Sequence, residues 1–112
     1  MRERVSKEKG GNVVPLVCGE MHNERIRQVA ATLKPRVIAV CGHDGLGQGL
    51  VPALLALNDR SGAAAIHCQH LDPSSAGHHH AVDRAGQRLT EELNKQAIGD
   101  DDFWYSTAVF KL

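Results

Sequence analysis

The sequence contains no long run of apolar residues. Its longest apolar stretches fall far short of the roughly 20 residues that a membrane-spanning helix requires. The first residues, Met1 to Arg4, include an acid and lack the apolar centre of a signal peptide. We therefore expect a soluble, cytoplasmic protein that does not bind a membrane.

The chain also lacks an excess of charge of either sign. Lysine plus arginine and aspartate plus glutamate both count 13, so the formal net charge is zero. No overall field would draw a nucleic acid or an acidic membrane surface to such a protein. This balance disfavours polyanion binding, and we expect no nucleic-acid partner.

Cysteine is scarce, whereas histidine is abundant. The three cysteines are an odd number without the short spacing of a disulfide framework, which favours free thiols in a reducing compartment. The seven histidines cluster instead of scattering, and three of them occupy positions 78–80. Such an enrichment of imidazoles beside thiols calls for an explanation.

The length of 112 residues fits one domain with a single hydrophobic core. Residues 1–12 are charged, end in Gly-Gly-Asn and offer no periodic apolar face, so we expect a flexible arm there. Residues 13–112 are expected to form a single α/β domain.

Apolar periodicity predicts four strands that alternate with three helices. Segment 23–34 repeats its apolar residues at the spacing of a helix that packs on one side, and segment 36–41 is the continuous β-branched run of a strand buried on both faces. This order predicts a three-layer βαβαβαβ unit with a four-stranded, mostly parallel sheet. The expected strands span 13–18, 36–41, 63–68 and 103–110, and the expected helices span 23–34, 50–57 and the stretch from residues 72–75 to about Asn94.

Three of the expected strands end in a cysteine with a histidine nearby. The carboxyl ends of parallel strands meet at one edge of a sheet, where open α/β sheets bind ligands. Imidazole and thiolate are ligands for Zn, Co, Ni and Fe, so these residues predict a metal site; the alternative is that the cysteines only pack in the core. The groups are Cys18 with His22, Cys41 with His43, and His67 with Cys68 and His70.

The three consecutive histidines are expected in the solvated first turn of the long helix. Neighbouring side chains on a helix point about 100° apart, so His78, His79 and His80 could not all face one ion. The pattern assigns none of them to the metal site.

A glycine-rich turn follows the second expected strand and opens a helix. In this position the backbone amides of Gly45, Gly47 and Gly49 could bind a phosphate. The glycine spacing differs from the dinucleotide fingerprint, and Asp44 adds negative charge where a phosphate would bind. The residues therefore favour a plain tight turn over an anion site.

Several stretches together resemble one enzyme family. They are the Val-Val-Pro-Leu strand at 13–16 followed by His22, the strand at 36–40 that leads to the helix at 50–57, and the Asp-Pro-Ser-Ser sequence at 72–75. In this order they resemble the CbiX type of class II tetrapyrrole chelatases, which include the sirohydrochlorin cobaltochelatases and ferrochelatases. The resemblance runs from about residue 13 to residue 108. It implies parallel α/β units whose histidines present a divalent metal to a porphyrin-like ring, and a homodimer.

The resemblance implies an enzyme that inserts Co²⁺ or Fe²⁺ into a sirohydrochlorin-like tetrapyrrole. His22 would hold the metal, with His67 or His70 as the second ligand and His43 as a third candidate. Glu20 would assist removal of the pyrrole protons. This hypothesis makes His22, Glu20 and His67 the expected catalytic residues.

The expected cofactor is a divalent metal, namely Co, Fe, Ni or Zn, and Cys41 and Cys68 are further candidate ligands. The expected partner is the tetrapyrrole or another small molecule. A metal that must be passed on suits a few neutral imidazoles with open coordination positions better than a closed cage of four thiolates.

Two other functions fit parts of the same pattern. The first is a non-enzymatic module that binds a phosphate or nucleotide through residues 42–49 or docks a partner. The second is a phosphocarrier with His43 as the phosphorylated residue, since the strand-His-Asp-Gly order loosely resembles sugar phosphotransferase components. A metal site would lose its ion as imidazoles protonate below about pH 6, whereas a phosphate site would persist.

Overall fold

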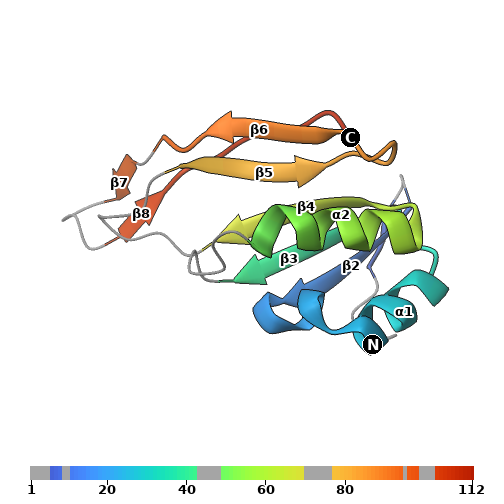
Figure 1. The fold of residues 1–112 in the computed structure, drawn as a ribbon. Helices are drawn as coiled ribbons and strands as arrows, with labels where there is room; N and C mark the ends of the chain where they lie inside the picture. Colours follow the sequence, from blue (N-terminus) through green and yellow to red (C-terminus); the bar gives the residue numbers. More distant parts are fainter. Residues whose placement is uncertain (1–5, 9–10, 43–48, 70–76, 95, 99–102) are drawn as a thin grey trace.

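The computed structural model describes residues 6–8, 11–42, 49–69, 77–94, 96–98 and 103–112. These residues form a six-stranded sheet, a separate two-stranded sheet, a 3₁₀-helix and two α-helices (Figure 1). In chain order the elements are β1 (Ser6–Glu8), β2 (Gly11–Val17), the 3₁₀-helix η2 (Cys18–His22), α1 (Glu24–Thr32), β3 (Val37–Gly42), α2 (Leu50–Ser61), β4 (Ala64–Gln69), β5 (His78–Val82), β6 (Arg88–Glu92), β7 (Gln96–Ile98) and β8 (Phe103–Tyr105).

The large sheet is parallel in its centre and antiparallel at its flanks. Its strands follow the order β1-β2-β3-β4-β5-β6, in which β2, β3 and β4 run parallel. The expected strands at 13–18, 36–41 and 63–68 are thereby confirmed as neighbours whose carboxyl ends share one edge. The register aligns Leu16, Val40 and His67 in one row across the three strands and Val17, Cys41 and Cys68 in the next row.

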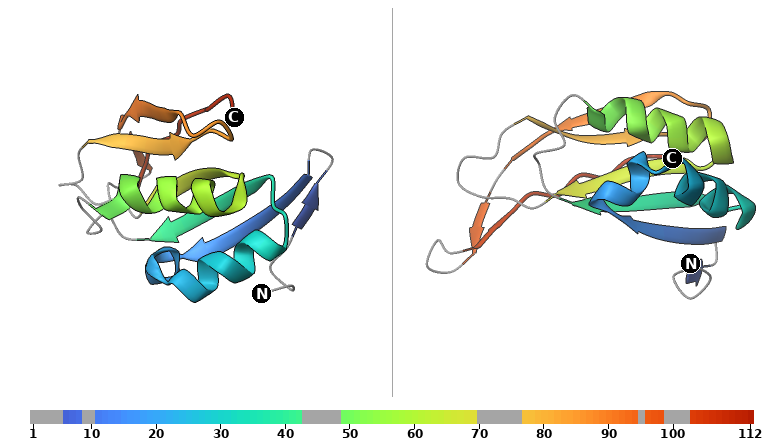
Figure 2. Two further views of the ribbon diagram at one scale, coloured as in Figure 1. Left: turned by 45° about the vertical axis from the view of Figure 1, so that its right-hand side comes forward. Right: turned by 60° about the horizontal axis from the view of Figure 1, so that its bottom comes forward.

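Both α-helices cover the same face of the large sheet (Figures 1 and 2). Each joins a parallel strand to its immediate neighbour in the same direction, and two such crossovers of one hand place their helices on one side. Alternate strand residues therefore point into the helix-covered core, and Val14, Ile38 and Val40 are completely buried there together with Leu54 of α2. The described elements form two layers, whereas the sequence predicted three.

The helix ends follow from local residues. The Asn23 side chain accepts a hydrogen bond from the backbone N of Ile26 at 3.2 Å and so caps α1. Helix α2 ends at Gly62, whose φ of 70° lies in the left-handed region that glycine tolerates. The helices expected at 23–34 and 50–57 are confirmed, the second with one further turn.

The long helix expected before Asn94 is wrong, because this stretch forms the hairpin of β5 and β6. The apolar residues of the stretch fit a helical period, but a turn at Asp83 to Gln87 reverses the chain instead. The backbone N of Gly86 donates to the Asp83 carbonyl at 3.0 Å, and the backbone N of Gln87 donates to the Asp83 carboxylate at 2.8 Å. Gly86 has a φ of 85°, which such a hairpin loop requires and which a helix excludes.

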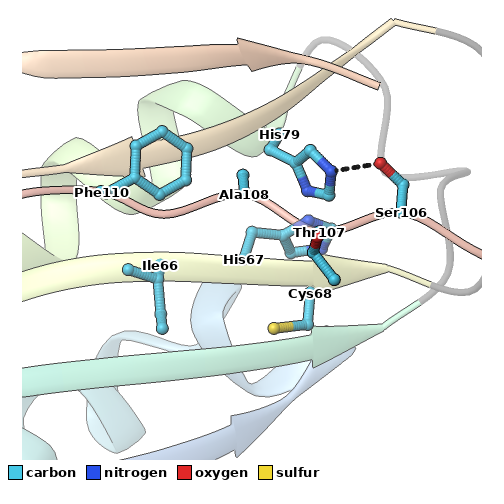
Figure 3. Close-up of a pocket in the computed structure, with 8 residues that line it drawn as sticks. All are labelled: Ile66, His67, Cys68, His79, Ser106, Thr107, Ala108 and Phe110. Atoms are coloured by element: carbon cyan, nitrogen blue, oxygen red, sulfur yellow. Dashed lines mark hydrogen bonds between the residues drawn. The ribbon is translucent and has the colours of Figure 1, made fainter. Parts of the chain in front are cut away.

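The C-terminal segment does not add a strand to the large sheet. The strand expected at 103–110 is confirmed only as β8, which pairs with β7. Residues 106–112 then run in an extended course over the helix-free face, across the junction of β4 and β5 (Figures 1 and 3). Ser106, Ala108 and Phe110 are half-buried, whereas Val109 is 91% exposed, so alternate residues face the sheet.

At the N-terminus, residues 6–8 of the expected arm pair with β2 as strand β1. The other residues of the arm lie outside the described part of the chain, apart from Gly11 and Asn12 in β2. Neither α-helix has the length and hydropathy needed to span a membrane, and the described residues contain no further helix of that kind.

Candidate functional site

A cavity of about 280 Å³ lies where the C-terminal segment crosses the sheet. In the antiparallel pairing of β4 and β5, Ala65 lies opposite Val82 and Ile66 lies opposite Ala81. The cavity lies beside these pairs. Figure 3 shows its lining, in which apolar residues and imidazoles face one another. The lining residues are Ile66, His67, Cys68, His79, Ser106, Thr107, Ala108 and Phe110.

One wall of the cavity is fixed by a hydrogen bond between distant parts of the chain. The His79 Nε2 and the Ser106 Oγ lie 2.8 Å apart (Figure 3), and Ser106 Oγ also accepts a hydrogen bond from the backbone N of Asn94 at 3.0 Å. Because the hydroxyl accepts from Asn94, its own proton can be donated to His79. This arrangement holds the C-terminal segment against β5.

His67 is the buried polar residue at the back of the cavity. Its side chain is only 7% exposed, and its Nε2 has no hydrogen-bond partner within the described part of the chain. Burial, and to a lesser extent the nearby His80, lower the pKa of His67, because both disfavour the charged ring. The ring is therefore neutral at pH 7.

His80, on the neighbouring strand β5, resembles His67 in having a buried ring nitrogen and a lowered pKa. Its Nδ1 is buried and also lacks a partner among the described residues. Burial lowers the pKa of His80 first, followed by the charges of His78 and His79. His67 follows Ile66 and His80 precedes Ala81, so both histidines come next to the last register pair of β4 and β5, and His80 is near enough to help lower the pKa of His67.

The histidine triplet at 78–80 lies in strand β5, which arranges its side chains differently from a helical turn. We expected the triplet in a solvated helical turn, and this is wrong because residues 78–82 form β5. Side chains alternate between the two faces of a strand, so His78 and His80 share one face and His79 takes the other. The ring centroids of His78 and His80 lie 6.3 Å apart, whereas His79 contacts the C-terminal segment.

The two described cysteine side chains lie on the opposite face from His67. Cys41 and Cys68 are register partners on β3 and β4, and both are exposed free thiols. Burial raises the pKa of Cys68, and the neighbouring Cys41 raises it further through charge and a hydrogen bond. Since His67 shares the row of the core residue Val40, alternation directs these thiols to the helix-free face.

Glu20 and His22, the candidate site residues that follow β2, have different surroundings from each other. Glu20 accepts a hydrogen bond from the backbone N of Val17 at 2.9 Å, which ties its carboxylate to the start of η2. His22 is exposed beside the first turn of α2, where a Cβ on Gly49 would lie 3.6 Å from the His22 Cε1. His22 and His67 thus lie at the same edge of the sheet, two strands apart.

Several predicted residues lie outside the described part of the chain, namely His43, Asp44, Gly45, Gly47 and His70, and the Cys18 side chain is not described. Among the residues that are described, no three histidine, cysteine or acidic side chains are grouped closely enough to hold a metal ion together. The described candidates are therefore a histidine pair on the helix side and a cysteine pair on the other side.

The sequence reasoning missed His79, His80 and Ser106. Their signal was the Asp-Arg-Ala-Gly turn at 83–86, which follows the histidines and favours a hairpin over a helix. In a hairpin, alternation would have separated His79 from the other two. No protein-family model matches this chain, and no curated protein matches it at a significant level.

Proposed function

We propose that this protein binds a divalent transition metal through His67 and His80. The supporting observation is the pair of buried imidazole nitrogens, His67 Nε2 and His80 Nδ1, which lack hydrogen-bond partners within the described residues. A buried polar atom without a partner is costly, and coordination of a cation by its lone pair removes this cost. Two such atoms on adjoining strands form the first two positions of a coordination site.

The protonation state of the two rings suits this role. A metal binds the neutral imidazole, and the lowered pKa values of His67 and His80 keep both rings neutral at pH 7. Imidazole ligands suit Zn, Co, Ni and Fe. Two protein ligands leave further coordination positions open, which fits a metal that is handed on and not a structural ion.

The receiving group in this proposal is a tetrapyrrole, so that the protein acts as a cobalt or iron chelatase. The support is the resemblance in the order of sequence motifs and the position of His67 at the carboxyl edge of parallel strands, where α/β sheets bind ligands. The cavity of about 280 Å³ is below the usual volume for enclosing a drug-sized ligand, so only part of a macrocycle would enter it. The remainder would extend along the edge towards His22 and Glu20.

Titration with Co²⁺ tests the metal site. The metal-free protein is titrated at pH 7.5, and the visible absorption of bound Co²⁺ is followed for the parent, the double variant His67→Gln/His80→Gln and the matched control His22→Gln. We expect the double variant to lose binding and His22→Gln to retain it. Unchanged binding in the double variant would contradict the proposed ligands.

A second experiment tests the transfer of the metal to the tetrapyrrole. Sirohydrochlorin is mixed with the Co²⁺-loaded parent and with the loaded His22→Gln and Glu20→Gln variants, and the change of the macrocycle absorbance is timed. Chelatase action predicts faster insertion than with free Co²⁺ at the same concentration. Insertion no faster than with free Co²⁺, despite intact metal binding, would retain the metal site and remove the enzymatic role.

A further inference from the structure

The thiols of Cys41 and Cys68 form an exposed pair on the helix-free face. The two residues are direct register partners on the parallel strands β3 and β4. Both side chains are exposed, and the Cys41 side chain is near enough to the Cys68 thiol to raise its pKa. Figure 3 shows the sulfur of Cys68 over the space between β4 and β3, on the side of Cys41's strand.

The strand residues next to this pair are apolar, and on the side of β5 Cys68 also lines the cavity with His79, Ser106 and Thr107. Val17 of β2 is the next residue in the same row and is 56% exposed. Ala39 and Ile66 occupy the preceding row of the same face, as the alternation of the strands requires. The thiols therefore lie side by side in an accessible row whose other strand residues are apolar.

The strand spacing disfavours closure of the pair into a disulfide. Neighbouring strands lie about 4.8 Å apart, and partners in a parallel ladder keep roughly this separation. A disulfide requires its Cβ atoms about 3.8 Å apart, which would pull the central strands of the sheet together. An ion bonded to both sulfurs separates them by two metal–sulfur bonds, each about 2.3 Å when the metal is zinc, so it needs no such movement.

From this geometry we infer that Cys41 and Cys68 form a two-thiolate site for a soft monovalent cation of the Cu(I) class. Thiolates are the ligands that select Cu(I) over harder ions. Binding replaces both thiol protons: two S–H bonds break, two S–Cu bonds form and two protons pass to solvent, with no change of oxidation state. The bound cation also removes the repulsion that two neighbouring thiolates would have. The site uses other residues than the proposed histidine pair and lies on the other face of the sheet, although Cys68 and His67 are neighbours in β4 that both line the cavity.

A competition titration tests this site. Cu(I), kept reduced with ascorbate under anaerobic conditions, is supplied as its coloured bathocuproine disulfonate complex, and the protein's capture of the ion is read as loss of that colour. The variants are Cys41→Ser and Cys68→Ser, with Cys18→Ser as the matched control and His67→Gln/His80→Gln as the test of independence.

We expect the parent to capture one Cu(I) per chain. Cys41→Ser and Cys68→Ser should each lose more than the roughly 10–100-fold in affinity that removal of an outer partner costs, because each removes a direct ligand. Cys18→Ser and the histidine double variant should keep parental affinity. Circular dichroism of each serine variant verifies that the fold is retained.

Three results would overturn the inference. The first is parental affinity in both Cys41→Ser and Cys68→Ser, and the second is a loss confined to Cys18→Ser. The third is a Cys41–Cys68 disulfide, found by peptide mass mapping, in a protein that does not bind Cu(I) when reduced. The Co²⁺ titration of Cys41→Ser/Cys68→Ser separates the two sites, since its binding should remain unchanged even though Cu(I) is lost.

Discussion

The parallel and antiparallel halves of this molecule differ in how their strands are connected and in how much of their surface is buried. The parallel half, from β2 to β4, joins neighbouring strands through helices and buries continuous apolar rows. The antiparallel half, from β5 to β8, consists of the strand pairs β5–β6 and β7–β8, whose described side chains are mostly exposed. Of the hydrophobic residues in the described buried core, only Ala81 and Val82 come from the antiparallel half.

This difference indicates which half stabilises the fold and where the candidate site lies. The parallel half has a core of its own, whereas the antiparallel half is attached through a short register with β4 and a few polar links. The histidine pair and the cavity lie at this attachment. A site at such a junction lies between a strand of the buried core and a strand that contributes only Ala81 and Val82 to the described core.

The largest expected difference between the halves concerns core truncation. Leu54→Ala removes a completely buried side chain from α2, and we expect a loss of about 2–5 kcal/mol in the free energy of unfolding. Leu89→Ala, at the half-buried position of the otherwise exposed strand β6, should cost clearly less. Val109→Ala, at a 91% exposed position, should stay within about 0.5 kcal/mol of the parent. Urea unfolding measures all three, and equal losses at positions 54 and 89 would contradict the comparison.

The next effect concerns the polar link between the halves. The Asn58 side-chain amide donates to the carbonyl oxygens of Ala63 at 2.9 Å, Asp83 at 3.0 Å and Arg84 at 3.2 Å. Asn58→Ala should cost about 1–3 kcal/mol, because it leaves backbone carbonyls without this donor. Hydrogen exchange should also accelerate in the β5–β6 hairpin more than in β3. Asp59→Ala, at the exposed neighbouring position, is the control. Equal acceleration of hydrogen exchange in the β5–β6 hairpin and in β3 would contradict the role of Asn58 as a polar link between the halves.

A smaller effect is expected at the hairpin turn. Gly86→Ala places a side chain at a φ of 85° and a Cβ 3.2 Å from the Asn58 Oδ1, so we expect a cost of about 1–2 kcal/mol. Gly19→Ala, where a Cβ would meet nothing within 4 Å, is the matched control. Thermal unfolding compares the two variants. A Gly86→Ala protein as stable as the parent would contradict the left-handed turn that sets β6 against β5.

The smallest predicted effect is the pH dependence of stability at the junction. The pKa values of His67 and His80 are lowered in the folded protein, so the unfolded chain takes up protons first as the pH falls below about 6.5. Stability should therefore be complete above this pH and decline as the pH falls towards the folded pKa values. Urea midpoints with EDTA at pH 7.5 and 5.5 measure the decline. The same decline in His67→Gln/His80→Gln would assign it to other groups.

The sequence predicts the parallel half well because its signals are local and redundant. The apolar period of segment 23–34 and the β-branched run at 36–41 each specify one structure, and α1 and β3 have the expected bounds within a few residues. The antiparallel half carries weaker signals. Val82, Leu89 and Leu93 fit a helical period, so only the left-handed Gly86 distinguished a hairpin from a helix.

The candidate site was predictable only in part for the same reason. The pattern predicts His67 near the carboxyl edge because it predicts β4, and the structure places His67 in β4 two residues before the strand ends at Gln69. The proximity of His67 to His80 depends on which strand lies beside β4, and nothing local to either residue specifies that neighbour. Ser106 reaches His79 through a segment 27 residues later, a contact that tertiary packing alone determines.

The most direct test of the proposed metal site is a long-range ¹H–¹⁵N NMR spectrum of the histidine rings, recorded without metal and with one equivalent of Zn²⁺ at pH 7.5. We predict that the His67 Nε2 and His80 Nδ1 signals move from neutral, unprotonated values to metal-bound values, while the other nitrogen of each ring keeps its proton. Unchanged signals from both rings, with a shift at His22 instead, would contradict metal binding at the junction of the two halves.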